Sequence, residues 1–481
     1  MGLATPPSVA EFVKDYDCLI EGIELLLRVQ QEVHRQGNME AIRAHYDKHP
    51  EDKLCDVYRP GTREMVLCRR SGIEAIHRIA CRLVAESPRA CDLSRKRISE
   101  IIRERILQIG LDGVTDDFEL VRVLKTYVDQ SESEHVEASY QFPCVLLHLG
   151  ADHPDLGPPP PDQFALGPVT FEQYPIFAKR FGHAIERHEK SADKKALELF
   201  SKTAEEHGWV ASVTMPRCAP DVSRARAEEI IEAAINLLKV FVGLRYAGQM
   251  RLPHVAPSRN RETCVLTEVN NEVKWSWHGR SLEGGMVAGD PMGHIPPRTR
   301  TFAGDLLSMA LSGSRDEATT RLLDALKWFG DGSFEASAGV QIVKWIAGLE
   351  RLTGTKRLPS GITRNFCKRV ALLASGLGSG NVEEAYRDAY RAYDLRSDVM
   401  HGSRSQNDEH LSRSAGFVHD LTRAAIMGAL SMHHFLSTRI GDGRVETMGK
   451  FYEDTAKPHE ALIENLHRKL RQPAHATRNS P

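Results

Sequence analysis

The stretch AYDLRSDVMHG, residues 392–402, decides the fold expected for the C-terminal part of this chain. It closes a helical segment that runs from Val382 to Met400, and Gly402 supplies the stop signal. Short breaks containing Gly, Ser or Pro separate this segment from four other helical segments, at 315–329, 334–352, 362–374 and 409–436. Because short breaks make neighbouring helices antiparallel, residues 301–440 are predicted to form an up-and-down helical bundle.

The chain before the bundle is predicted to hold a helical region, 1–135, and a small α+β region, 136–280. Three amphipathic patterns indicate helices in the helical region, at 12–34, 73–84 and 94–110, with Ser94 as the N-cap of the third. A further amphipathic helix is expected in the α+β region, at 223–246. Strands are expected there at 141–150, 164–172, 209–215 and 273–277.

Two segments have the composition of connections. Residues 281–300 are rich in Gly and Pro and have no periodicity, which is typical of a linker. Residues 441–481 are predicted to be a partly disordered tail, with the disorder beginning after Lys457. The fold class expected for the whole chain is therefore mainly α.

Composition excludes several classes of protein. The formal net charge is −2 over 481 residues, so any contact with nucleic acid must come from a local site. Nine cysteines without a C-x-x-C pair are typical of thiols in a reducing cytoplasm. No segment approaches the roughly 18 apolar residues of a membrane-spanning helix, and no export signal is recognisable. We expect a cytoplasmic protein that makes no contact with membrane.

Arg396 and His401 are the candidate catalytic residues. Cleavage of RNA without metal requires a base for the 2′-hydroxyl, a stabilising charge for the phosphorane and an acid for the 5′ oxygen. A histidine can act as base or acid near neutral pH, and an arginine presents a charged planar fork to phosphate oxygens. The spacing alone is a weak signal, because 21 histidines produce about one or two such pairs by chance.

The same segment resembles a known family. AYDLRSDVMHG is similar to the R-x4-6-H signature of HEPN domains, and to the Apea-like branch, in which a Tyr, an Arg-Ser and a His-Gly follow in this order. IAGLERLTG, at 346–354, and ITRNFCKRVALLAS, at 362–375, also fit that branch. Over residues 301–440 the resemblance implies a HEPN bundle with endoribonuclease activity, in prokaryotic anti-phage defence or a toxin-like role. No metal and no cofactor are expected.

The resemblance also implies a homodimer. Five residues on a straight helix place two side chains about 140° apart, so Arg396 and His401 of one chain do not converge on one phosphate. In HEPN nucleases two bundles pack so that both motifs line one cleft, and twofold contacts are the commonest form of self-association. Glu350 is expected to orient Arg396 or His401, unless it is an ordinary helix-surface charge. The 300 upstream residues would restrain the nuclease, with a regulatory protein or a phage trigger as partner.

Structural interpretations compete at these residues. Arg396 could pair with a neighbouring carboxylate, and His401 could form a hydrogen bond at the helix end. Ser397 and Asp398 could cap the helix or bond locally, and Tyr393 could belong to the core rather than stack on a base. The rival functions are a non-catalytic HEPN module that binds RNA, nucleotide or a protein partner, and a purely structural dimerisation domain.

Overall fold

The structure is a computed structural model, in which the chain divides into two compact units. One unit consists of Met1–Glu137 and Pro216–Arg224, and the other of Ala138–Met215 and Ala225–Pro481. The protein is mainly helical, as predicted. The residues that the structure describes are 54–58, 65–87, 89–102, 117–146, 161–188, 194–242, 250–253, 261–269, 272–280, 295–313, 315–335, 337–354, 361–406, 408–441 and 448–471.

The first unit contains a β-hairpin that the sequence analysis did not predict. Strands β1 (Leu54–Tyr58) and β2 (Met65–Arg69) pair antiparallel, with Cys55 opposite Cys68. The runs LCDVY and MVLCR are short and rich in apolar residues, and a run of five residues does not distinguish a strand from a helical turn. The helix predicted at 12–34 lies outside the described residues.

Two of the described helices of the first unit lie at predicted apolar patterns, and the third, α5 (Asp117–Ser133), was not predicted as a separate helix. Helix α3 (Arg70–Glu86) contains the pattern at 73–84. The other helix, described over 95–102, begins after Ser94, whose hydroxyl accepts a hydrogen bond from the Arg97 N–H at 3.0 Å. This contact confirms the predicted N-cap, because it satisfies one of the unpaired N–H groups of the first turn.

The second unit begins with a six-stranded sheet in the order β4-β5-β6-β3-β7-β8. The predicted strand at 164–172 is instead a hairpin, because Gly167 turns the chain with a φ of +58°. The loop expected between the first two predicted strands lies outside the described residues from 147 to 160. The strands are β3 (Val136–Val145), β4 (Gln163–Leu166), β5 (Val169–Gln173), β6 (Gly208–Cys218), β7 (Arg261–Val269) and β8 (Glu272–Arg280).

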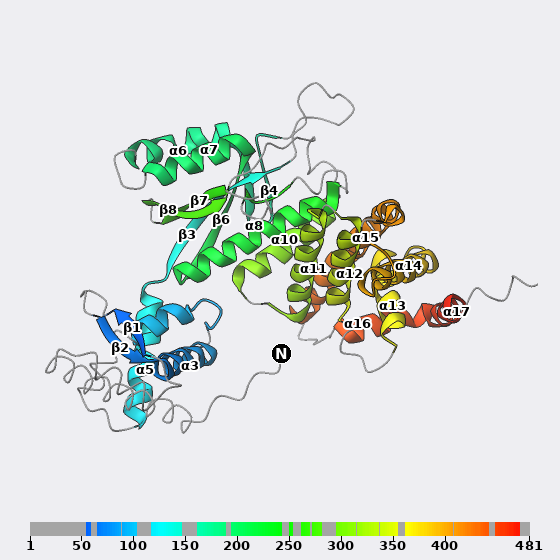
Figure 1. Ribbon diagram of the computed structural model, residues 1–481, viewed down its shortest axis with the longest axis horizontal. Helices are drawn as coiled ribbons and strands as arrows, with labels where there is room; N and C mark the ends of the chain where they lie inside the picture. Colours follow the sequence, from blue (N-terminus) through cyan, green and yellow to red (C-terminus); the bar gives the residue numbers. More distant parts are fainter. Residues whose placement is uncertain are drawn as a thin grey trace, which may run out of the picture. The chain divides into compact units, whose positions relative to one another are not determined.

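Helices cover both faces of this sheet (Figure 1). On one face, α6 (Tyr174–His188) and α7 (Lys194–His207) form a small core in which Phe177 and Phe200 pack with Val210 of β6. On the other face lies α8 (Pro220–Val242), at the predicted position. Its buried residues share one core with the inner side chains of the sheet, among them the fully buried Trp209.

The five helical segments predicted for the bundle are all present. Each boundary agrees with the prediction to within five residues, and those at Ile362, Ala374, Val382, Met400 and Glu409 agree fully. A sixth helix, α10 (Pro297–Ser312), precedes them, whereas 281–294 of the predicted linker lie outside the described residues. The five are α11 (Glu317–Ser333), α12 (Ala338–Thr353), α13 (Ile362–Ala374), α14 (Val382–Met400) and α15 (Glu409–Gly441).

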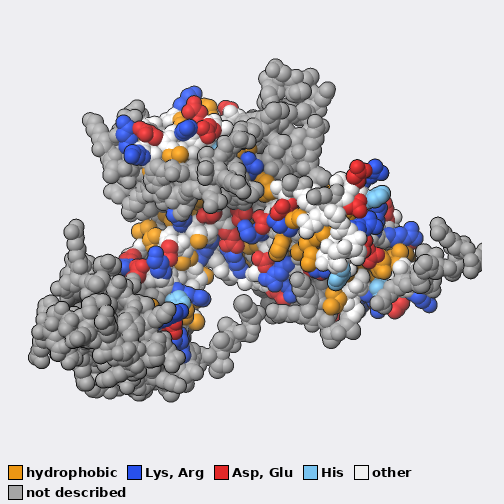
Figure 2. All heavy atoms as spheres, viewed as in Figure 1, with side chains coloured by type: hydrophobic (Ala, Val, Ile, Leu, Met, Phe, Trp, Pro, Cys, Tyr) orange, Lys and Arg blue, Asp and Glu red, His pale blue; other side chains and the backbone are white. Residues whose placement is uncertain are grey.

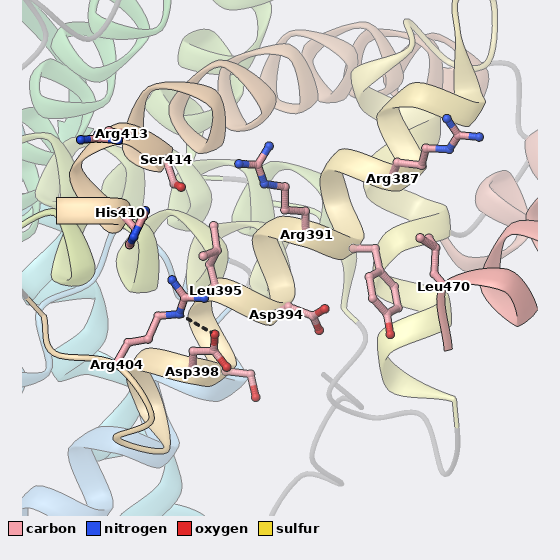
Figure 3. Close-up of a pocket in the computed structure, with 12 residues that line it drawn as sticks. Arg387, Arg391, Asp394, Leu395, Asp398, Arg404, His410, Arg413, Ser414 and Leu470 are labelled. Carbon is pink, nitrogen blue, oxygen red and sulfur yellow. Dashed lines mark hydrogen bonds and ion pairs between the residues drawn. The ribbon is translucent and has the colours of Figure 1, made fainter. Parts of the chain in front are cut away.

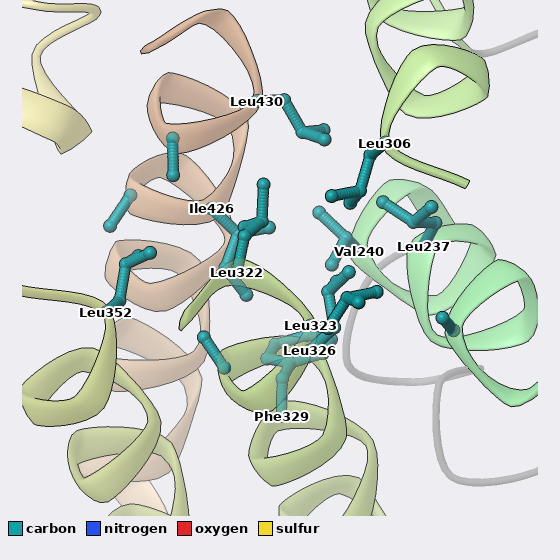
Figure 4. Packing of buried hydrophobic residues seen from close by; sticks show 14 of the residues in the cluster. Leu237, Val240, Leu306, Leu322, Leu323, Leu326, Phe329, Leu352, Ile426 and Leu430 are labelled. Atoms are coloured by element: carbon teal, nitrogen blue, oxygen red, sulfur yellow. The ribbon is translucent and has the colours of Figure 1, made fainter. Parts of the chain in front are cut away.

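One hydrophobic core continues from the sheet into the bundle (Figure 4). Leu237 and Val240 of α8 face Leu306 of α10 and Leu323 of α11 across the contact between the two parts. The guanidinium of Arg423, on α15, donates to the Phe241 carbonyl at 3.2 Å and also to that of Val240. These bonds satisfy carbonyl groups at the C-terminal end of α8, which otherwise lack partners.

The segment predicted as a tail is largely helical between residues 448 and 471. Helices α16 (Met448–Ala456) and α17 (Glu460–Arg471) flank the short 3₁₀-helix η4 (Lys457–His459). The expected disorder after Lys457 is wrong as far as Arg471, because Ile463 and Leu466 give α17 an apolar face that is buried in the bundle core.

Lys239 of α8 supplies a prediction about stability and pH. The side chain is buried, with its ammonium 2.8 Å from Asn236 Oδ1 and 4.0 Å from the centre of the Phe334 ring. Burial lowers the pKa of Lys239 to about 7, although Glu232 and Asp331 oppose this shift. The unfolded lysine keeps its proton to about pH 10, so this group makes the free energy of unfolding rise between pH 7 and about 10.

The rise should reach about 1.4 kcal/mol per pH unit and be absent in Lys239→Met, whose side chain has no charge to desolvate. Urea titrations of both proteins at pH 7, 8 and 9 measure the difference. Parallel curves for the two proteins would contradict the lowered pKa of Lys239.

Candidate functional site

The predicted motif lies at the C-terminal end of α14. Asn381 caps the beginning of this helix by accepting a hydrogen bond from the Glu384 N–H at 3.1 Å. Two glutamates in the first turn interact favourably with the helix dipole. The helix ends at Met400, His401 is its C-cap, and Gly402 has a φ of +74°. The local sequence therefore places the motif where a helix stops and side chains reach solvent.

Arg396 points toward α12 and contacts Glu350 there. Its Nη2 lies 3.4 Å from Glu350 Oε2, which is long for a charge-assisted hydrogen bond. The Glu350 side chain is 5 % exposed and that of Arg396 is 23 % exposed. Within the described ranges Arg396 forms no other ion pair, and its Nε is buried without a hydrogen-bond partner. The buried Nε is not open to solvent, so an incoming anion can reach the guanidinium only through the exposed part of the side chain.

His401 lies in solvent at the end of the helix. Its backbone N–H donates to the Ser397 carbonyl at 2.9 Å, and its residue is exposed. Within the part of the chain that the structure describes, no hydrogen bond or ion pair joins the imidazole to Arg396 or Glu350. Glu350 thus contacts only one of the two residues that it was expected to orient. The two catalytic candidates are not brought into contact within one chain.

The supporting residues adopt local roles. Asp398 forms an ion pair with Arg404, at 2.9 Å from Nε, and its carbonyl accepts the Ser403 N–H. Tyr393 packs on Phe366, with the ring centres 4.9 Å apart. Burial raises the pKa of the Tyr393 hydroxyl above its ordinary value. For these two residues the geometry favours the structural interpretation.

A groove of about 810 Å³ lies beside the motif on another face of α14 (Figure 3). We call it the arginine groove, after the four arginines that line it. Two of them, Arg387 and Arg391, come from α14, and Arg413 comes from α15. The fourth, Arg404, comes from the connection between these helices, and the imidazole of His410 on α15 also lines the groove. Four residues of the stretch 392–402 also line it: Asp394, Leu395, Ser397 and Asp398.

The sequence analysis missed this groove. Its signal on α14 is a run of polar residues at 387, 391, 394 and 398, which repeats every three or four positions and therefore marks one helix face. The contribution of Arg413 and His410 could not be read from spacing, since it depends on how α15 packs against α14.

No family model, curated protein or solved structure matches this chain. Within the described ranges, no three His, Cys, Asp or Glu side chains gather closely enough to hold a metal ion. None of the helices that the structure describes has the length and apolar character needed to cross a bilayer. Figure 2 shows basic and acidic side chains interspersed over the bundle, so local features such as the arginine groove must supply any attraction for polyanions.

Proposed function

We propose that the C-terminal bundle is a HEPN-type endoribonuclease, which cuts RNA by attack of a 2′-hydroxyl on the adjacent phosphate. The observation that carries the proposal is the geometry at the end of α14. There an exposed imidazole, His401, follows a guanidinium, Arg396, whose only ion pair among the described residues is a long contact with Glu350. One group is free to exchange protons with a substrate, and the other retains hydrogen-bond donors for phosphate oxygens.

The proposed cleavage step accounts for every proton that moves and every bond that forms or breaks. The imidazole of His401 removes the proton from the 2′-hydroxyl, and the resulting oxygen forms a bond to phosphorus. Arg396 stabilises the additional negative charge of the phosphorane. The bond from phosphorus to the 5′ oxygen then breaks, and that oxygen takes a proton from an imidazolium. The products are a 2′,3′-cyclic phosphate and a 5′-hydroxyl.

In the proposed nuclease, a second copy of the chain brings a guanidinium and an imidazole together at one site. Arg396 is directed toward α12, and no contact joins it to His401 among the described residues. A twofold dimer that packs the ends of two α14 helices together would bring the Arg396 of one chain to the His401 of the other. In such a composite site the His401 imidazolium formed by taking the 2′-hydroxyl proton supplies the proton that the leaving 5′ oxygen takes.

The biological setting rests on the resemblance to Apea-like HEPN domains. A ribonuclease inside a cell must be restrained, and anti-phage defence or a toxin-like role supplies conditions in which it would be released. The residues before the bundle are then the part that responds to a regulatory protein or a phage trigger. The alternative is a non-catalytic HEPN module that binds RNA, nucleotide or a protein partner. The arginine groove supports this alternative as well as it supports the nuclease, because binding of a ligand needs no reactive group.

Mixed dimers test the composite site. We expect Arg396→Ala and His401→Ala proteins to be inactive separately and to regain about a quarter of the parent rate when equal amounts are refolded together. Random assembly makes about half of the dimers mixed, and each mixed dimer holds one intact site of two. The measurement is release of cyclic-phosphate ends from labelled RNA. Two folded, dimeric variants that restore nothing on mixing would contradict the sharing of one site between chains.

A further inference from the structure

The arginine groove carries an inference that goes beyond the cleavage site. It runs along α14 for about three turns, from Arg387 to Asp398, and the first turn of α15 forms its other wall. Arg396 and His401 are not among its lining residues. The groove is therefore a second feature of the same helix, and its properties can be argued without those of the catalytic pair.

Two of the four arginines of the groove, Arg391 and Arg413, are only weakly engaged by the protein, whereas Arg387 forms an ion pair with Glu383 and Arg404 forms one with Asp398. Arg391 lies over the Phe417 ring, with its Cζ 4.4 Å from the ring centre, and forms no ion pair within the described residues. Arg413 is 77 % exposed, and its contact with Glu409 is 3.9 Å long. Exposed pairs of this kind contribute little free energy, so an incoming anion displaces them at little cost.

The acidic side chains in the groove do not cancel this charge. Asp398 is already paired with Arg404, as the dashed line in Figure 3 marks. Partial burial and the charge of Asp398 raise the pKa of Asp394 above its ordinary value, which favours its neutral form at a given pH. The lining residues include four arginines and two aspartates, and Glu383 and Glu409, which do not line the groove, pair with Arg387 and Arg413. These two pairs are exposed and therefore cost little to exchange for a phosphate, and Arg391 has no carboxylate partner among the described residues.

We propose that the arginine groove binds the sugar-phosphate backbone of single-stranded RNA. Arg387 and Arg391 are one turn apart, about 6 Å along the axis, which is close to the separation of adjacent phosphates in an extended strand. The half-buried Tyr390, whose ring packs on the core and meets His467 edge to face, lines the groove beside them, and interleaved arginine and aromatic groups are typical of single-strand binding.

An acidic peptide is the competing ligand for a basic groove. Its carboxylates would meet the arginines, but it has no planar base for Tyr390 and no regularly spaced phosphates along α14. The inference deepens the proposed function, because strand binding here would deliver RNA to the end of α14. The inference rests on the proposed function for the biological purpose of RNA binding. The binding itself does not depend on the cleavage chemistry.

Binding of an uncleavable strand tests the inference. The probe is a fluorescent 2′-O-methyl oligoribonucleotide, whose blocked hydroxyl cannot attack phosphorus, and the readout is anisotropy over a series of salt concentrations. For the full chain carrying Arg391→Gln and Arg413→Gln we expect the slope of log K against log salt to fall by about 1.4, or about 0.7 per lost phosphate contact. Affinity at low salt should fall with it.

The double variant Arg298→Gln with Arg300→Gln is the matched control, because it removes the same two charges from exposed positions on α10. Helix α10 meets α15 where Phe302 stacks on His434, about 30 Å along α15 from Arg413. This variant should bind with the parent slope. An unchanged slope in the variant with Arg391→Gln and Arg413→Gln, or displacement of the probe by polyglutamate as readily as by RNA, would overturn the inference.

The binding test and the cleavage test can fail separately. An unchanged slope together with loss of cleavage in His401→Ala would reject the groove and leave the nuclease intact. A reduced slope together with cleavage that survives in His401→Ala would reject the nuclease and leave the groove intact.

Discussion

Replacing His401 with alanine should lower the rate of RNA cleavage by about 10²–10⁴-fold, the usual contribution of a general base or acid. The reason is that the proposed mechanism assigns removal of the 2′-hydroxyl proton to the His401 imidazole. Single-turnover cleavage of labelled RNA, with analysis of the ends produced, measures the rate and shows whether cyclic phosphate still forms. Binding to the 2′-O-methyl strand should be retained, because His401 does not line the arginine groove.

Arg396 gives the companion result. Arg396→Lys keeps the positive charge but loses the planar fork, so the rate should recover only partly relative to Arg396→Ala. His459→Ala, in η4 of the same unit, removes an imidazole that has no assigned role and should cleave at the parent rate. Cleavage by His401→Ala at the parent rate would exclude the nuclease proposal. So would a dimeric parent protein that cleaves no RNA, and the binding module would then be the better interpretation.

Gly428→Ala should destabilise the protein by about 3 kcal/mol or more. A Cβ at this position of α15 would lie 2.1 Å from the Leu373 carbonyl oxygen and 2.7 Å from its carbon. These atoms belong to the backbone of α13 and cannot turn away, so the two helices must separate and lose contacts that run the length of the bundle core. Urea titration monitored by circular dichroism measures the change.

Gly416→Ala is the matched control in the same helix. Nothing lies within 4 Å of a Cβ added there, so the exchange removes only the conformational freedom of glycine. We expect a gain of about 0.5–1 kcal/mol. Equal effects at the two positions would show that α13 and α15 do not approach each other as closely as described.

The sequence predicted the helices of the bundle well because their limits depend on nearby residues. Asn381 and Gly402 bound α14 through a side-chain cap and a left-handed turn, and both lie within one turn of the helix. The hairpin β1–β2 escaped prediction because a strand is stabilised by its partner, and a five-residue run does not reveal that partner.

The candidate site was also predicted only in part. Arg396 and His401 were found because the motif is continuous in the sequence. The sequence also indicated that one helix cannot bring both side chains to the same phosphate. Glu350, 46 positions earlier in the chain, was expected to orient Arg396 or His401, and only the structure shows that it contacts Arg396 and not His401. The arginine groove was missed because α14 supplies only one of its walls.

The sequence by itself determined the mainly helical class, the limits of most helices in the bundle and the position of the motif at a helix end. The spacing of apolar residues, the caps and the stop residues act over one or two helical turns, so they can be recognised in the sequence alone. Only the tertiary structure decided the strand order of the sheet, the ion pair between Arg396 and Glu350, and the close approach of α15 to α13 at Gly428. These features join residues far apart in the chain, and their distances follow from how whole helices and strands pack around a shared core.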